Sequence, residues 1–314
     1  MRSCAWSSAG PSPRADWERE MTTIAFLGLG NMGGPMAANL VGAGHDVRGF
    51  DPVEAAQDAA RTAGITVCDS PAEAVRGAGV VITMLPNGAL VTSTYEHVLG
   101  VAGEGTLFID SSTISVEDAR AVHATAVAAG MLQVDAPVSG GVKGATAGTL
   151  AFMVGGEDQA FAAAQPVLEP MAGKIIHCGG PGAGQAAKVC NNMVLAVHQI
   201  AIGEAFVLAE RLGLEHQALF DVVTGATGNS WALHTNCPVP GPVPTSPANN
   251  DFTPGFATAL MNKDLGLALS ALESTGTVAP LGAAAAALYD EFAKDNGGRD
   301  FSAIITSIRD SSRG

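Results

Sequence analysis

Short apolar runs rich in β-branched residues alternate with alanine-rich segments over the first 180 or so residues. The apolar runs occupy 23–28, 46–50, 80–85, 106–110, 132–136, 151–154 and 174–177. The alanine-rich segments lie around 32–43, 53–63, 71–78, 88–99, 115–130 and 158–171. Strands that alternate with helices pair mainly in parallel, and the helices cover both faces of the sheet. The pattern therefore predicts an α/β unit.

Beyond Gly184 only helical patterns remain, near 184–213, 215–224, 256–274 and 279–295, with a proline-rich loop from Pro238 to Pro254. The 314 residues are enough for two domains. We expect a Rossmann-type domain over 21–182 and an all-α domain over 183–314, with the helix 184–213 bridging the two. We expect residues 1–20 to be a disordered leader, because Met21 stands directly before the first strand. A mitochondrial targeting segment is the lesser alternative.

Composition excludes several classes of function. The chain has 16 Lys and Arg residues and 30 Asp and Glu residues, which gives a net charge of −14. A polyanionic partner such as nucleic acid or an anionic membrane is therefore not expected. The five cysteines are scattered, which favours a reducing, cytoplasmic compartment, and the histidines show no metal-binding spacing. The apolar stretch Met193–Ala209 is interrupted by polar residues, which is typical of a buried helix rather than a membrane span.

The first chemical motif follows the first apolar run and opens a helix, and it reads Gly28-Leu29-Gly30-Asn31-Met32-Gly33. Glycines at these positions allow a tight turn and let the backbone approach a pyrophosphate at the helix N-terminus. Asp51 ends the second run, 18 positions after Gly33. A carboxylate there accepts hydrogen bonds from ribose hydroxyls and repels a 2′-phosphate, which predicts NAD rather than NADP. Arg48 leaves a minor use of NADP open.

A second motif, Asp135-Ala136-Pro137-Val138-Ser139-Gly140-Gly141, lies at the end of a predicted strand. Ser139, Gly140 and Gly141 either form an ordinary turn or present successive N–H groups and a hydroxyl to a carboxylate.

A third motif places Gly184, Lys188 and Asn192 four residues apart, on one stripe of a helix. Their neighbours are apolar, and burial lowers the pKa of a lysine toward the range of proton transfer at neutral pH. Lys188 is therefore a candidate general acid or base for the hydroxyl proton of an alcohol. The alternative is a lysine at the domain junction whose stem lies along apolar surface.

The segment from Ala25 to Leu40, AFLGLGNMGGPMAANL, resembles the N-terminal signature of the β-hydroxyacid dehydrogenases. The resemblance extends from Thr23 to about Ser307 and includes a fourth motif, Leu260 to Leu267. It implies a fold like that of 6-phosphogluconate dehydrogenase. It assigns proton transfer to Lys188 and the substrate carboxylate to the Ser139–Gly141 segment, and it gives substrate contacts to Asn192 and Asp264. It also implies cofactor contacts at Leu85, Pro86, Thr113 and Lys263. Trp231 either walls the substrate pocket or belongs to the core.

The resemblance is strongest to members that oxidise 3-hydroxyisobutyrate to methylmalonate semialdehyde with NAD, a step of valine degradation. Alternatives in the same reaction class are reductions of tartronate, glyoxylate or succinate semialdehyde. An alternative of another class is a module that senses NAD without catalysis, although no part of the four motifs is missing. The apolar helical half carries few charges and so offers surfaces for a partner subunit, which indicates a homodimer or homotetramer. No metal is expected.

Overall fold

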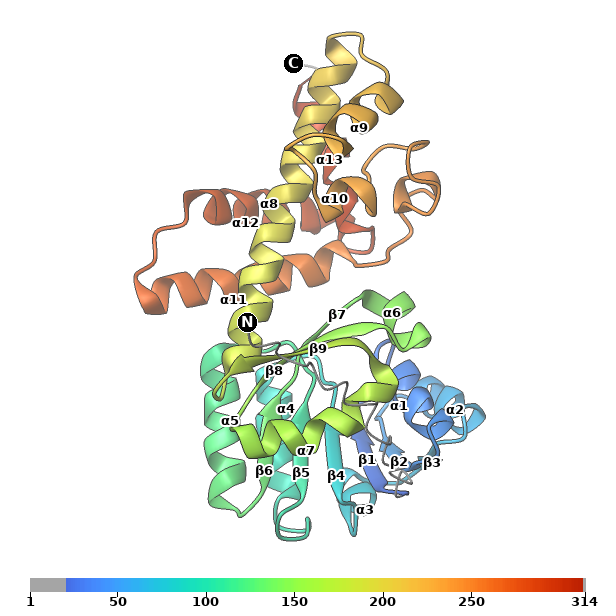
Figure 1. The fold of residues 1–314 in the computed structure, drawn as a ribbon, viewed down its shortest axis with the longest axis vertical. Coiled ribbons are helices and arrows are strands. Elements are labelled where there is room, and N and C mark those ends of the chain that lie inside the picture. Colours follow the sequence, from blue (N-terminus) through green and yellow to red (C-terminus); the bar gives the residue numbers. More distant parts are fainter. Residues whose placement is uncertain (1–20, 313–314) are drawn as a thin grey trace, which may run out of the picture.

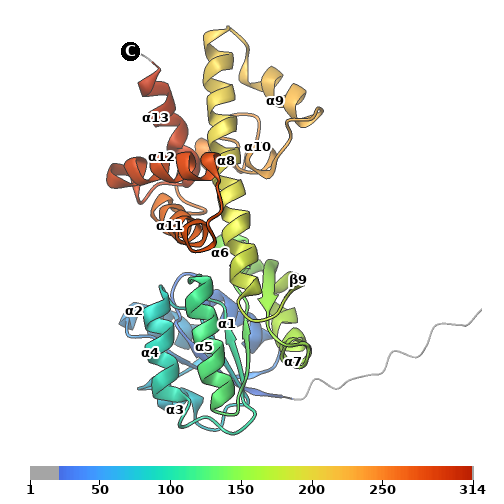
Figure 2. The same cartoon turned by 90° about the vertical axis from the view of Figure 1, so that its left-hand side faces the viewer.

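The computed structural model describes residues 21–312, so the predicted leader at 1–20 lies outside the described residues. A sheet covered by helices forms one half, and a group of helices forms the other (Figures 1 and 2). The long helix α8 (Ala183–Arg211) begins against the sheet and runs through the helical half. The predicted fold class, a mainly parallel α/β unit followed by an all-α unit, is confirmed.

The sheet in the described residues has nine strands. They are β1 (Thr23–Leu27), β2 (Asp46–Phe50), β3 (Thr66–Val67), β4 (Val80–Thr83), β5 (Leu107–Asp110), β6 (Leu132–Asp135), β7 (Val138–Ser139), β8 (Leu150–Gly155) and β9 (Ala172–Gly179). Their order is β3-β2-β1-β4-β5-β6-β8-β7, and β9 also pairs with β8. The pairs from β3 to β6 are parallel, and β8 is antiparallel to β6 and β7. Parallel pairing brings the carboxyl ends of β1, β4 and β5 to one edge, where ligands bind in such sheets.

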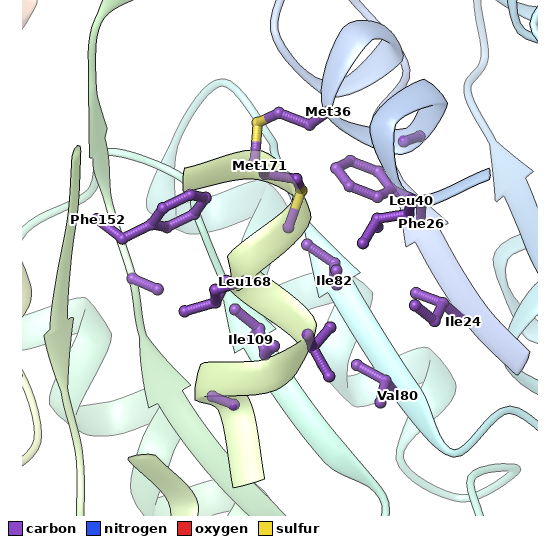
Figure 3. Close-up of a cluster of buried hydrophobic side chains, with 14 of the residues drawn as sticks. Ile24, Phe26, Met36, Leu40, Val80, Ile82, Ile109, Phe152, Leu168 and Met171 are labelled. Carbon is purple, nitrogen blue, oxygen red and sulfur yellow. The ribbon is translucent and has the colours of Figure 1, made fainter. Parts of the chain in front are cut away.

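Helices cover both faces of this sheet. One face packs against α1 (Gly33–Gly42), α2 (Glu54–Thr62), α6 (Gly141–Ala147) and α7 (Asp158–Leu168), and the other against α3 (Pro71–Val75), α4 (Gly88–Val98) and α5 (Val116–Ala128). Figure 3 shows the first core, where Phe26, Ile82 and Ile109 of the central strands face Leu40 of α1 and Leu168 of α7. Alternate residues of the buried strands point to opposite faces, which explains why these strands are apolar throughout.

In the helical half, α8 is the common packing partner. The other elements are α9 (His216–Thr224), α10 (Trp231–His234), the 3₁₀ turn η2 (Pro247–Asn249), α11 (Thr258–Thr275), α12 (Pro280–Asn296), the 3₁₀ turn η3 (Phe301–Ala303) and α13 (Ile304–Ser311). Ala196 of α8 belongs to a cluster with Met261 of α11 and Tyr289 of α12. Phe206, farther along α8, belongs to a cluster with Leu233 of α10. Figure 1 shows α11 crossing α8 near the sheet and α12 crossing it farther along.

The structure also contains short elements that the sequence pattern does not predict: β3, β7, α6, α10 and α13. The two-residue strands are too short to show a period of two, and α6 begins at Gly141, where a turn was expected. Tertiary contacts order such segments, because isolated short helices and strand pairs are marginal in water.

By length and hydropathy α8 passes as a possible membrane span: it has 29 residues, and its most apolar window has a mean hydropathy of 1.5. Of that window, 44% is buried inside the protein. A single helix of this kind is weak evidence for a membrane, because the core helix of a soluble protein meets the same criterion.

Candidate functional site

The glycine loop between β1 and α1 has the geometry of an anion cradle. Gly28 has φ +97°, and a Cβ at Gly33 would lie 1.9 Å from the carbonyl oxygen of Gly28, so both positions require glycine. A Cβ at Gly30 would meet no atom within 4 Å in the described residues, so this part of the loop faces open space. Neither a capping side chain nor an acidic residue occupies the first turn of α1 in the described structure. These residues fit the pyrophosphate of a dinucleotide.

Asp51 holds the glycine loop in place. Its Oδ2 accepts the N–H of Leu29 at 2.8 Å, and its Oδ1 accepts the N–H of Val53 at 2.8 Å. The carboxylate therefore lies beside the loop at the end of β2, where ribose hydroxyls are bound in dinucleotide folds. The sequence pattern predicted the position of Asp51 but not these two hydrogen bonds. Asn31 and Met32 lie between the glycines, and Met32 is the residue that precedes α1.

Lys263 of α11 reaches across to the sheet. Its Nζ donates to the carbonyl oxygen of Thr113 at 2.7 Å and to that of Pro86 at 3.4 Å. The N–H of Leu85 donates to the Ser112 hydroxyl at 2.8 Å, which joins the loops after β4 and β5. The structure thus brings Lys263 of the helical half close to the loops that contain Leu85, Pro86 and Thr113. These are the four residues outside the glycine loop and Asp51 for which the resemblance implies cofactor contacts.

Lys188 lies on α8 with only 7% of its surface exposed. Its Nζ donates to the carbonyl oxygen of Val138 at 2.8 Å, immediately before Ser139. Burial lowers the pKa of Lys188 below its usual range, and the carboxylate of Asp264 opposes this shift. The stripe of α8 that the four-residue spacing predicts is therefore buried at Lys188, at the junction of the two halves.

Asn192 and Asp264 form a pair next to Lys188. Asn192 Nδ2 donates to Asp264 Oδ2 at 2.6 Å, which links α8 to α11. Burial raises the pKa of Asp264, whereas Lys188 and Lys263 lower it. Lys263 Nζ lies 3.7 Å from Asp264 Oδ1. Two lysines, a carboxylate and an amide are therefore gathered at the start of the helical half.

Ser139 ends β7, Gly140 precedes α6, and Gly141 is the first residue of α6. Both glycines have positive φ, at 138° and 60°, and a Cβ at Gly141 would lie 2.9 Å from the carbonyl oxygen of Gly255. Glycine at 141 thus permits a close approach between the two halves. The segment is a strand end that turns into a short helix rather than an isolated turn.

Trp231 begins α10 and is 48% exposed. Its helix packs against α8 around Phe206, which is about 27 Å along the helix axis from Lys188 at ~1.5 Å per residue. Within one chain the structure does not bring Trp231 to the other predicted substrate residues. Its role as a pocket wall stays a prediction.

Two buried polar residues that the motif analysis left without a role connect these parts. Asp135 of β6 accepts the N–H groups of Gly182 and Gln185 at 2.8 Å each. The side chain of Gln185 binds the backbone of the loop after β5, with Nε2 donating to Ser112 O at 2.7 Å. Asp135 opens the second motif, and Gln185 directly follows Gly184 of the third. A polar residue next to a predicted catalytic stripe was the signal that could have identified Gln185.

Comparisons with known proteins agree with this arrangement. A family model described as the NAD binding domain of 6-phosphogluconate dehydrogenase matches residues 23–180. A model described as the NAD-binding of NADP-dependent 3-hydroxyisobutyrate dehydrogenase matches residues 182–308.

Individual relatives cover almost the whole chain. The "Probable 3-hydroxyisobutyrate dehydrogenase" of Mycobacterium tuberculosis is 70% identical over 289 residues, which is 92% of this chain and 98% of the relative. The NAD-dependent L-serine dehydrogenase of Pseudomonas aeruginosa is 43% identical, over 94% of this chain and 100% of the relative. A solved structure of Mycobacterium tuberculosis 3-hydroxyisobutyrate dehydrogenase with L-serine has a TM-score of 0.90 at 70% identity, covering 92% and 99%.

The chain therefore belongs to the β-hydroxyacid dehydrogenase family, as the resemblance implied. It is an NAD-dependent dehydrogenase that acts on the CH–OH group of a hydroxy acid.

Substituting Gly33 with alanine tests the cradle. The added methyl would lie 1.9 Å from Gly28 O, so α1 must move away from the loop, and we expect the affinity for NADH to fall at least about tenfold, or ~1.4 kcal/mol. Titration of NADH fluorescence measures this. Gly42→Ala is the matched control on α1, because its Cβ would meet no described atom within 4 Å. Equal NADH affinities for the two variants would contradict the assignment.

Proposed function

We propose that this enzyme oxidises 3-hydroxyisobutyrate to methylmalonate semialdehyde, as in the degradation of valine, in the cytoplasm. The observation that carries the proposal is the buried cluster of Lys188, Asn192 and Asp264 beside the Ser139–Gly141 segment and the cofactor loops. The names of the M. tuberculosis relatives support the choice of substrate.

Lys188 is the proposed general base. A lysine must be neutral to accept a proton, and burial favours the neutral form by lowering its pKa. NAD, when bound, would supply the acceptor for the hydride of the substrate carbon. Lys188 Nζ takes the hydroxyl proton, which leaves the substrate as the aldehyde and Lys188 in its ammonium form. Asp264 stabilises that ammonium, because a nearby carboxylate favours the charged form.

The remaining site residues bind and orient. Ser139, Gly140 and Gly141 hold the substrate carboxylate through N–H groups and the hydroxyl, which is an arrangement that favours an anion. Asn192 orients the substrate, and Asp264 fixes the Asn192 amide through the bond of 2.6 Å. Gly28 to Gly33, Asp51, Leu85, Pro86, Thr113 and Lys263 hold NAD, with Lys263 already bound to the carbonyl oxygens of two of these residues.

L-Serine is a second candidate substrate. A relative at 43% identity is named as an L-serine dehydrogenase, and the solved relative contains L-serine. Both candidates are small acids with a hydroxymethyl group on the carbon next to the carboxylate, and they differ in a methyl or an ammonium substituent there. The same proton transfer serves both, so relative kcat/KM values decide between them.

We also propose that the enzyme is a homodimer or homotetramer formed through the helical half. An apolar groove of about 380 Å³ lies between α8 and α12, and it is lined by residues such as Met193, Val197 and Pro280. Leu281 in this groove is 69% exposed. A second copy that covers these side chains would remove apolar area from water, the main driving force for association.

Replacing Lys188 with alanine tests the chemistry. We expect kcat for 3-hydroxyisobutyrate to fall at least ~100-fold, because general acid–base groups typically contribute that much, while NADH affinity stays unchanged. The measurement is the initial rate of NAD reduction with 3-hydroxyisobutyrate or L-serine and, in the reverse direction, of NADH oxidation with tartronate semialdehyde, glyoxylate or succinate semialdehyde. Lys174→Ala, on the edge strand β9, is the control. A K188A enzyme that keeps more than about a tenth of the wild-type kcat would refute the role of Lys188.

Asp264→Asn tests the electrostatic coupling. The asparagine oxygen still accepts from Asn192, but the negative charge that raises the pKa of Lys188 is gone. The pKa of Lys188 therefore falls further, and the rise of kcat/KM with pH moves to lower pH. Full pH–rate profiles of both enzymes measure this, and a profile that stays in place or moves to higher pH contradicts the assignment.

Leu281→Glu tests the association. A charge in the apolar groove makes its burial costly, so we expect the mass measured by light scattering to fall to that of one chain. Val127→Glu, on the exposed side of α5, should leave the mass unchanged. A mass that is unaltered in both variants would exclude this groove as the interface.

A further inference from the structure

Gln185 joins the first turn of α8 to the loop that follows β5. Its side chain is fully buried. Nε2 donates to the carbonyl oxygen of Ser112 at 2.7 Å, and Oε1 accepts the N–H of Ile114 at 3.2 Å. Both ends of the amide are therefore bound to backbone on either side of Thr113, which fixes the helix and the loop relative to each other.

Asp135 provides a second connection at the same helix turn. The residue before α8 is Gly182, which has φ +81° and no side chain to cap the helix. Asp135 caps it instead, with Oδ1 accepting from Gly182 N and Oδ2 from Gln185 N at 2.8 Å each. A Cβ at Gly184 would lie 2.2 Å from Met153 O, so the helix start is pressed against the sheet. The first turn of α8 is thus anchored to β6 and β8.

The loop that Gln185 binds is connected in turn to the rest of the cofactor side. Ser112 Oγ accepts the N–H of Leu85 at 2.8 Å, and Thr113 O accepts from Lys263 Nζ at 2.7 Å. One continuous set of hydrogen bonds therefore runs from α8 through the β5 loop to the β4 loop and α11.

Gln185 precedes Lys188 by three residues, so the two side chains leave the helix on neighbouring parts of its surface. A helix turn moves as a unit, and a shift or rotation at Gln185 displaces Lys188 with it. Hydride and proton transfer are sensitive to such displacements, because an error of ~1 Å in placement costs about 10²-fold in rate.

We infer that Gln185 is a positioning residue: its amide sets the placement of Lys188 relative to the loops that hold NAD. The inference deepens the proposed function and rests on the proposed role of Lys188. Among the described residues the Gln185 side chain binds only backbone groups, so its effect on catalysis acts through the helix.

The test compares Gln185→Leu with a matched control, Gln199→Leu. Gln199 is on the same helix, is also fully buried, and donates through Nε2 to a backbone carbonyl, that of Asn236, at 3.4 Å. We expect kcat of the Q185L enzyme to fall about 10- to 100-fold, with KM for the hydroxy acid changed less than about threefold. The primary deuterium isotope effect on kcat, measured with substrate deuterated at the carbinol carbon, should rise. The Q199L enzyme should keep kcat within about twofold and an unchanged isotope effect.

A purely structural role gives a different result. Both variants leave buried backbone groups unpaired, so both are expected to lower the unfolding temperature. If Q185L and Q199L lower kcat equally, or if Q185L keeps the wild-type kcat and isotope effect, the positioning role is overturned.

Amide hydrogen exchange without substrate separates this inference from the proposed function. In Q185L the amides of residues 112–114 should exchange faster than in wild type, whereas in Q199L they should not, because Ile114 N–H loses its acceptor only in the first variant. Unchanged exchange in Q185L refutes the connection itself. A wild-type enzyme that oxidises no hydroxy acid refutes the proposed function instead.

If Q185L does not fold, Gln185→Glu serves in its place. The carboxylate keeps an acceptor for Ile114 N–H but cannot donate to Ser112 O. A lower kcat with a raised isotope effect supports the positioning role, and a wild-type kcat overturns it.

Discussion

The buried carboxylate of Asp135, held by the backbone N–H groups at the start of α8, is the interaction on which the geometry of the site depends. Burial raises the pKa of this carboxyl group, and the N–H groups of Gln185 and Gly182 counteract the shift. A buried charge is tolerated only where such donors replace water. The helix N-terminus adds a favourable partial positive charge. The contact joins two halves with separate cores, and it decides where the helix with Lys188 and Asn192 leaves the sheet.

Electrostatics within the site oppose those of the whole chain. The net charge is −14, yet the cofactor and the substrate are both anions. In the proposed mechanism the attraction comes from groups close to the ligands: the N–H groups of the glycine loop, the segment at Ser139, and the two lysines. Lys188 and Asp264 share one buried environment, which disfavours both charged forms, while each favours the charge of the other. Burial makes the neutral form of Lys188 accessible, and the carboxylate of Asp264 stabilises its charged form.

Much of this structure follows from local patterns. The apolar runs predicted the longer strands, because strands buried on both faces are apolar throughout. The glycine loop and Asp51 were predicted from spacing, and their chemistry needs only a strand, a turn and a helix in succession. The spacing of four placed Lys188 and Asn192 on one stripe of α8, and both are buried. The short elements β3, β7 and α6 escaped prediction, since their order depends on neighbours distant in sequence.

The sequence by itself determined the fold class, the cofactor cradle and the residue types available for proton transfer, because these depend on periodicity and on residues close together in the chain. Only the tertiary structure decided which of these residues lie in contact with one another. Asp135 and Gln185 are 50 positions apart, and Lys263 and Pro86 are 177 apart. The helix that begins at Trp231, in contrast, packs far along α8 from Lys188. Such contacts depend on strand order and helix packing, since hydrogen bonds and burial act over a few ångströms in space whatever the separation along the chain.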